Sequence, residues 1–123
     1  MCVIYVAFGQ RADRPLILIA NRDEFYERPT AAAAWWDNAP NIFAGRDLVS
    51  GGTWLGVTKD GRFAAVTNYR DPNAPIGKRS RGLLVSDFLR SSKTPSEYLA
   101  EVSQVADDYS GFNLLAGRID QDQ

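Results

Sequence analysis

Two apolar runs near the N-terminus are separated by polar residues and predict a pair of strands. Residues 2–8 are rich in β-branched and aromatic side chains, and residues 16–20 form a near-continuous apolar run. Both compositions are typical of strands. The polar, turn-like residues 9–15 suit a hairpin connection. We expect the second run to be covered on both faces, because strands buried on both sides are near-continuously apolar.

The next part of the chain, residues 22–41, predicts an irregular segment. Pro29 marks a bend, and the alanine run 31–34 has helix propensity but is too short to form a helix alone. Trp35 and Trp36 follow directly. We interpret the two tryptophans as anchors that pin a long loop to the core, with ligand stacking as the less favoured role.

A second hairpin is predicted in the middle of the chain. Residues 54–58 and 63–67 have strand composition, and the turn between them contains the dipeptide Asp60-Gly61. Asp-Gly between two such runs is a strong hairpin signal. A short strand over residues 42–45 precedes this hairpin.

Two amphipathic helices and one more strand complete the pattern. The spacing of apolar residues predicts a helix over 82–90, with Ser80 as its N-cap. Its inner face would hold Leu84, Val85, Phe88 and Leu89, and its outer face Ser86, Asp87 and Arg90. Thr94-Pro95-Ser96-Glu97 has the form of a capping box and opens a second helix that extends to about Asp107. Its apolar stripe would consist of Tyr98, Leu99, Val102, Val105 and Ala106. Residues 113–117 predict a further strand.

This order of elements indicates the fold class. Strands, then two helices, then a returning strand predict an α+β fold with antiparallel strands and helices on one face. The 123 residues suit one domain. Because a new strand begins shortly before the sequence stops, we expect residues 1–123 to be a single domain that is incomplete at its C-terminus.

Composition and charge narrow the class of protein. The net charge of −1 offers no basic field for nucleic acid, and no apolar run is long enough to span a membrane. A single cysteine excludes an intramolecular disulfide and fits a reducing compartment, so we expect a cytoplasmic protein. The chain contains no histidine. Ser-His and Cys-His nucleophile pairs and histidine-bound metals are therefore excluded for this chain, and no cofactor is expected.

The candidate chemistry centres on Cys2. Antiparallel pairing of the first two strands would bring Cys2 beside Arg22 and Asp23. If Met1 is removed, the α-amine of Cys2, with a reference pKa of about 8, can act as the base for its own thiol, whose reference pKa is about 8.5. Arg22 would stabilise a thiolate or orient a substrate carbonyl, Asp23 would hold the α-ammonium, and Asn68, at another strand end, could donate to an oxyanion.

Simpler roles exist for the same residues. Cys2 can be a small apolar residue at the start of a strand, and Arg22 and Asp23 a salt bridge at a strand end. We interpret Arg46-Asp47 as a surface pair. The basic residues 78–81 form either a solvated loop or a site for an anionic group at the following helix N-terminus.

Several motifs together resemble one known family, the NRDE family, which includes the transport and Golgi organisation protein 2 group. The matching segments are Met1-Cys2, Ala20-Asn21-Arg22-Asp23-Glu24-Phe25-Tyr26, Arg28-Pro29-Thr30, Ala44-Gly45-Arg46-Asp47, Gly51 to Thr58, Thr67-Asn68-Tyr69-Arg70, Ser80-Arg81-Gly82 and Gly111-Phe112-Asn113-Leu114-Leu115. The resemblance implies a fold like that of N-terminal-nucleophile (Ntn) hydrolases, a four-layer αββα sandwich. Members are longer, so this chain resembles their N-terminal half.

The resemblance also bears on function. The family is similar, more distantly, to cysteine amidohydrolases that use an N-terminal Cys, an Arg and an Asp, which correspond to Cys2, Arg22 and Asp23. The first hypothesis is therefore an Ntn-type cysteine hydrolase that cleaves a linear, non-peptide amide in a small-molecule substrate.

The alternative is a non-catalytic protein that binds or traffics a lipid-like or haem-like ligand, since eukaryotic members are linked to Golgi organisation, lipid metabolism and haem handling. Tyr26, Trp35, Trp36 and Trp54 motivate this alternative. A haem would need Cys2 or a tyrosine as its axial ligand here.

Overall fold

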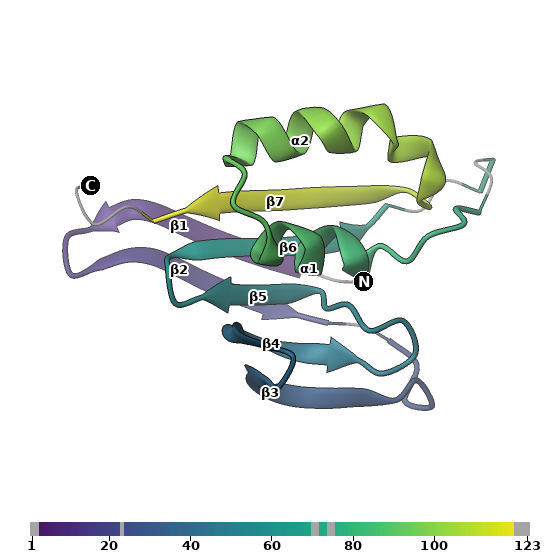
Figure 1. Cartoon of the computed structure of the whole chain (residues 1–123), viewed down its shortest axis with the longest axis horizontal. Coiled ribbons are helices and arrows are strands. Elements are labelled where there is room, and N and C mark those ends of the chain that lie inside the picture. The colour runs from purple at the N-terminus through teal and green to yellow at the C-terminus, as the bar shows by residue number, and fades with distance from the viewer. Residues whose placement is uncertain (1–2, 23, 70–71, 74–75, 120–123) are drawn as a thin grey trace.

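The computed structural model describes residues 3–22, 24–69, 72–73 and 76–119. Along these residues the chain forms a hairpin, four further strands, two helices, a short 3₁₀ helix and a last strand (Figure 1). Their bounds are β1 Val3–Arg11, β2 Arg14–Asn21, β3 Thr30–Trp36, β4 Ala39–Asp47, β5 Leu55–Thr58, β6 Arg62–Asn68, α1 Gly82–Arg90, α2 Pro95–Gln104, the 3₁₀ helix Ala106–Asp108 and β7 Phe112–Arg118.

Two antiparallel sheets and a layer of helices stack on one another (Figure 1). The larger sheet has the strand order β3-β4-β5-β6-β7, and β1 and β2 form a separate sheet. Both helices pack on one face of the larger sheet. The hairpin lies on the other face, where the rings of Phe8 and Phe63 have centroids 6.2 Å apart. The predicted α+β fold with antiparallel strands and helices on one face is confirmed.

The N-terminal hairpin has the predicted pairing. Val3 lies opposite Asn21 and Phe8 opposite Leu16, so the start of β1 lies beside the end of β2. The expectation that β2 is covered on both faces is wrong. Its residues are half-buried or exposed, and Ile19 is 64% exposed. The larger sheet packs on only one side of the hairpin, so the apolar run of β2 does not indicate burial on both.

The segment predicted to be irregular contains a strand, β3. It pairs with β4, with Trp35 opposite Phe43. Alanine favours helix, but a run of four alanines is too short to form one alone, and ladder formation with the neighbouring strand outweighs that preference. Side chains alternate along this strand. Trp36 is buried and donates its indole N–H to the carbonyl oxygen of Ala44 at 3.2 Å, whereas Trp35 is 52% exposed. The anchor prediction is thus confirmed for Trp36 and wrong for Trp35.

The second predicted hairpin is confirmed as β5 and β6. Gly61 in its turn has a φ of +90°, a backbone conformation that glycine adopts readily. The observed strands differ from the predicted ones by a residue at some ends, which is within the normal spread of strand boundaries.

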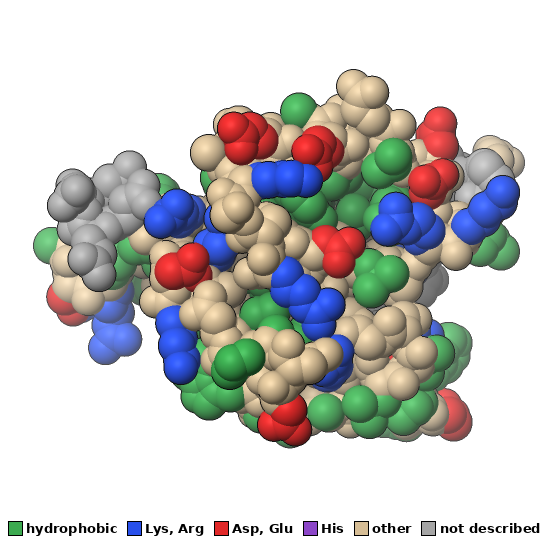
Figure 2. All heavy atoms as spheres, viewed as in Figure 1, with side chains coloured by type: hydrophobic (Ala, Val, Ile, Leu, Met, Phe, Trp, Pro, Cys, Tyr) green, Lys and Arg blue, Asp and Glu red, His purple; other side chains and the backbone are tan. Residues whose placement is uncertain are grey.

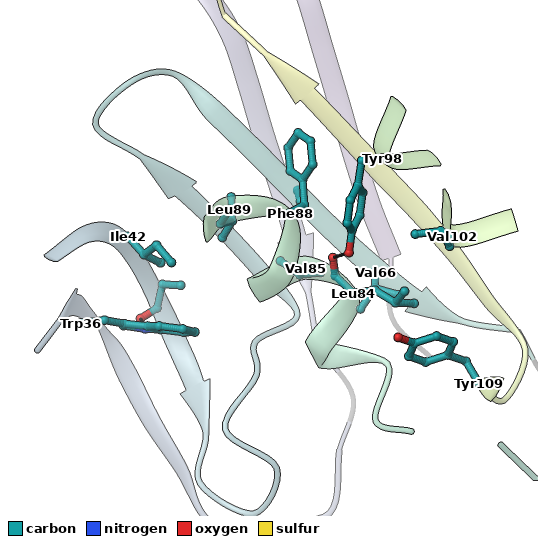
Figure 3. Close-up of a cluster of buried hydrophobic side chains, with 12 residues drawn as sticks. Trp36, Ile42, Val66, Leu84, Val85, Phe88, Leu89, Tyr98, Val102 and Tyr109 are labelled. Atoms are coloured by element: carbon teal, nitrogen blue, oxygen red, sulfur yellow. Dashed lines mark hydrogen bonds between the residues drawn. The ribbon is translucent and has the colours of Figure 1, made fainter. Parts of the chain in front are cut away.

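The core lies between the larger sheet and the helices (Figure 3). The four predicted inner residues of α1, which are Leu84, Val85, Phe88 and Leu89, are all buried. Tyr98, from α2, packs against Phe88 with 5.2 Å between the two ring centroids. Its hydroxyl donates a hydrogen bond to the carbonyl oxygen of Leu84 at 2.6 Å. Burial raises the pKa of Tyr98, so this phenol stays protonated and remains a donor.

Details of the helices differ from the sequence prediction. Ser86 is buried rather than outward, and its hydroxyl bonds back to the carbonyl oxygens of Gly82 and Leu83. Leu99 and Val105 are 40% and 38% exposed instead of inward. α2 has the predicted capping box, but it ends at Gln104 and a 3₁₀ turn follows.

Candidate functional site

A polar cavity of about 430 Å³ opens at the end of the larger sheet. Its walls come from the segment after β2, the start of β3, the end of β4, the turn after β4, the end of β6 and the loop before α1. This volume suits a small molecule. Segments that are far apart in the sequence therefore share one concave site.

The structure brings two predicted site residues to this cavity. Arg22 and Asn68 both line it. Arg22 directly follows the end of β2, opposite which β1 starts at Val3, and Asn68 is the last residue of β6. Cys2 and Asp23 lie outside the described residues.

Arg22 is partly buried in the cavity wall, with 25% of its side chain exposed. Among the described residues its ion-pair partner is Glu24, with 3.8 Å between Nη2 and Oε2. That separation is too long for a hydrogen bond. Glu24 is held in place in turn, because its other oxygen accepts the backbone N–H of Phe25 at 2.9 Å.

Arg28 and Asp47 form an ion pair that the sequence reasoning missed. Arg28 donates Nε–H to Oδ1 of Asp47 at 3.2 Å and Nη2–H to Oδ2 at 2.6 Å. The hydrogen bond to Asp47 raises the pKa of Arg28, although burial opposes the shift. Recognition of β3 as a strand would have revealed this ion pair. Thr30 lies opposite Asp47 in the antiparallel pair of β3 and β4, so Arg28, two residues before Thr30, falls near the end of β4.

The prediction that Arg46 and Asp47 form a surface pair is wrong. They are neighbours on β4, and successive side chains on a strand point to opposite faces. Arg46 instead donates to the carbonyl oxygen of Gly51 at 3.1 Å and to Oδ1 of Asn38 at 3.0 Å. Its guanidinium lies 4.1 Å from the centroid of the Trp36 ring. These contacts hold a fixed positive charge at the cavity wall.

The loop before α1 supplies three more cationic residues to the cavity, Lys78, Arg79 and Arg81. Backbone contacts fix this loop: Gly77 N–H donates to the Ser110 hydroxyl at 2.9 Å, and Arg79 N–H to the carbonyl oxygen of Asp108 at 2.9 Å. Arg81 itself donates to the carbonyl oxygen of Gly111 at 3.0 Å. The loop is therefore attached along its length to the segment before β7.

The N-terminus of α1 also borders the cavity. Ser80 is not its N-cap as predicted. Arg81 occupies that position, without a side-chain hydrogen bond to the helix, and no acidic residue lies in the first turn. The helix start lies close to the turn after β4, because Thr53 N–H donates to the carbonyl oxygen of Gly82 at 3.2 Å.

The charges around the cavity are unequal. Among the described residues, six cationic side chains line it, those of Arg22, Arg28, Arg46, Lys78, Arg79 and Arg81, against the two carboxylates of Glu24 and Asp47. Positive charges that surround a concave, partly desolvated site attract anions. The cavity is basic although the whole chain carries a net charge of −1.

The aromatic residues that motivated a ligand-binding alternative do not meet at one surface. Trp54 lines the cavity, whereas Trp36 is buried in the core. Trp35 projects from the opposite face of β3, and Tyr26 is fully exposed.

The described part of the chain contains no group of three or more cysteine and acidic side chains placed to hold a metal ion. Within the same residues, the helices are too short and too polar to cross a membrane.

Comparison with known proteins gives the family. The family model described as Transport and Golgi organisation 2 matches residues 1–123. The Transport and Golgi organization 2 homologues of Mus musculus and Homo sapiens are each 43% identical over 123 residues, which covers 94% of this chain and 45% of theirs. Transport and Golgi organization protein 2 of Drosophila melanogaster is 33% identical over 128 residues, with the same coverage.

The chain spans a little under half the length of these relatives, at 45% of each. The match nevertheless extends from Met1 to Gln123. The resemblance seen in the sequence motifs is confirmed, and the chain belongs to the Transport and Golgi organisation 2 family.

Proposed function

We propose that this protein is a cysteine hydrolase of the Ntn type, with Cys2 as the nucleophile, and that it cleaves a linear, non-peptide amide. The observation that carries the proposal is the meeting of Arg22 and Asn68 at one cavity. Arg22 directly follows β2 and Asn68 is the last residue of β6, and these two strands belong to different sheets. The hairpin register places the start of β1 beside the segment that holds Arg22.

In this mechanism removal of Met1 frees the α-amine of Cys2. The amine takes the thiol proton, and the thiolate attacks the amide carbonyl to form a C–S bond. The tetrahedral intermediate breaks its C–N bond, and the leaving amine receives the proton. Water then attacks the thioester, releases the carboxylic acid and restores the thiol.

The neighbouring residues have separate roles in this proposal. Arg22 orients the substrate carbonyl and favours the thiolate, and Asp23 holds the protonated α-amine. Asn68 donates its amide N–H to the oxyanion. No histidine takes part, in keeping with a sequence that has none.

The layering of the molecule supports an Ntn-like fold. Helices, a five-stranded sheet and a second sheet follow one another in that order (Figure 1). These layers correspond to three of the four in an αββα sandwich, and we propose that the chain forms the first part of one.

The test is intact-mass analysis of the 123-residue chain with iodoacetamide between about pH 6 and pH 9. We expect Met1 to be absent and the thiol to titrate below its reference pKa of about 8.5. Arg22→Gln should raise that pKa and slow alkylation near neutral pH. Arg11→Gln, which removes a charge at the far end of the hairpin, is the matched control and should have no effect.

Retained Met1, or a thiol that titrates at or above its reference value, would overturn the hydrolase proposal. That result would favour the alternative of a non-catalytic protein that binds or traffics a lipid-like or haem-like ligand. An absorbance titration with haem, compared between the chain and Cys2→Ala, would then test the haem version.

A further inference from the structure

We infer that the substrate carries an oxyanion, either a phosphate or a carboxylate group, and that Lys78, Arg79 and Arg81 bind it in the cavity. The inference rests on the proposed function, because it names the substrate class of the same site. The observations that support it concern the loop before α1 and not Cys2, so it can be tested separately.

The first argument is the positive charge of the cavity that the described carboxylates do not pair. Arg28 is paired with Asp47, and Arg22 with Glu24. For Arg46, Lys78, Arg79 and Arg81, no described carboxylate lies within ion-pair distance. Four cations that share one cavity repel one another, and an anionic ligand relieves this repulsion.

The second argument is that part of this charge is held in place before any ligand binds. The backbone of Arg79 is bonded to Asp108, and its guanidinium lies 5.2 Å from the centroid of the Tyr109 ring. Arg81 uses Nη1 to donate to the carbonyl oxygen of Gly111. A guanidinium has five N–H donors, so this single bond leaves Arg81 able to bind an oxyanion. Donors fixed in advance bind at a lower entropic cost.

The third argument is the shape of the site. The three cationic residues lie close together in the sequence, within residues 78–81, on a loop that lines a cavity of about 430 Å³ rather than an open surface. The positive end of the α1 dipole adds to the same field, with no acidic residue in the first turn to cancel it. Figure 2 shows Lys and Arg side chains at the end of the molecule where Figure 1 draws this loop.

The test is an NMR titration of the ¹⁵N-labelled chain carrying Cys2→Ser, with inorganic phosphate and with acetate in separate series at constant ionic strength. We expect saturable shifts of the backbone amides of residues 78–83 with at least one of the two anions. The anion that saturates at the lower concentration identifies the group on the substrate. Absence of saturation with both anions would overturn the inference.

Matched double variants separate a site from a general charge effect. Lys78→Gln/Arg79→Gln should weaken anion binding at least about tenfold, since charge-assisted hydrogen bonds are lost. Arg11→Gln/Arg14→Gln removes the same charge at the turn of the β1–β2 hairpin and should change affinity less than about twofold. Equal weakening by both would overturn the inference. Unchanged amide shifts away from the loop would show that each variant is folded.

The outcomes distinguish the two proposals because Cys2→Ser removes the thiol from the binding measurement. Anion binding together with retained Met1 would leave the anion site standing and remove the hydrolase. An activated thiol in the original chain, with no saturable binding of phosphate or acetate, would leave the hydrolase proposal standing and remove the anion site.

Discussion

Arg28 and Asp47 form a two-point ion pair that ties the segment after β2 to the end of β4. Their side chains are 33% and 12% exposed, so the pair is partly removed from water. Arg28 also lies 3.5 Å from the hydroxyl of Ser50. The pair therefore fixes one wall of the cavity with more geometric definition than an open surface salt bridge offers.

Arg28→Lys should destabilise the protein, because an ammonium cannot match the two carboxylate oxygens as a guanidinium does. We expect the free energy of unfolding to fall by about 1–2 kcal/mol in urea denaturation. The matched change Arg14→Lys, at an exposed residue of the first hairpin, should cost less than about 0.5 kcal/mol. Equal effects of the two changes would show that the paired geometry contributes nothing.

The same pair should make stability depend on pH in the acid range. Burial raises the pKa of Asp47, but hydrogen bonds from Arg28 and from the amides of Val49 and Ser50 lower it more, so the pKa lies below its ordinary value of 3.8. A carboxyl whose pKa is lower in the folded state stabilises the fold above its unfolded pKa. This stabilisation is lost as the pH falls through the folded value.

Asp47→Asn removes this contribution at every pH. The difference in free energy of unfolding between the original chain and Asp47→Asn should therefore be largest near neutral pH and shrink below about pH 3.8. Urea denaturation of both proteins at about pH 6 and about pH 2.5 measures it. A difference that is the same at the two pH values would contradict the assignment.

Local patterns were enough to predict the hairpins and helices. Asp60-Gly61 specifies its own turn, and the capping box at Thr94 and Glu97 is a contact between residues three apart. The strand β3 could not be recognised in this way. Its alanines become a strand only through pairing with β4, and that register also brings Arg28 to Asp47.

The candidate site was predicted only in part, for a related reason. Arg22 and Asn68 were selected because polar residues follow or end their apolar strands, and the structure brings both to one cavity. The basic residues 78–81 were recognised as one possible site for an anionic group. Their meeting with Arg46 at one cavity depends on contacts between distant segments, which sequence patterns do not reveal. The roles proposed for Cys2 and Asp23 stay predictions, because these residues lie outside the described part of the chain.

Arg62 should be a major contributor to stability. Its side chain is 2% exposed and donates to the carbonyl oxygens of Phe88 at 3.2 Å and Lys93 at 2.7 Å, which joins β6 to the end of α1. Arg62→Met keeps much of the volume but removes the donor to the Lys93 carbonyl oxygen and one of the donors to the Phe88 carbonyl oxygen, which still accepts from Ser91. We expect a loss of about 2–4 kcal/mol in the free energy of unfolding.

Arg14→Met is the control for this change, because Arg14 is exposed at the hairpin turn and should tolerate the substitution within about 0.5 kcal/mol. Chemical denaturation of both variants is the measurement. A small loss for Arg62→Met would mean that water replaces the missing donor.

Gly52→Ala should alter the cavity together with the stability. A Cβ at residue 52 would lie 2.5 Å from the carbonyl carbon of Gly82, where only backbone atoms are available to move. The start of α1 would have to shift away from Thr53, at a cost of about 1–3 kcal/mol. Amide chemical shifts of Gly82 and Leu83 should change most. Shifts confined to the residues next to Gly52 would contradict this prediction.

An apolar stripe crosses three strands on the face of the larger sheet that the helices leave open. Trp35 lies opposite Phe43, and Phe43 opposite Val57, with the rings of Trp35 and Phe43 5.1 Å apart. The three side chains are 52%, 38% and 36% exposed. A flat apolar stripe near an edge strand favours association with other chains.

We therefore expect the 123-residue chain to self-associate as its concentration rises, and Trp35→Thr/Phe43→Thr to reduce this association while keeping residues that suit a strand. Sedimentation velocity measures it. Leu48→Thr/Val49→Thr removes two apolar side chains that are also exposed, at 57% and 61%, but on a turn instead of a flat sheet, and should leave association unchanged. A chain that stays monomeric, or an equal effect of the two double variants, would show that the stripe does not drive association.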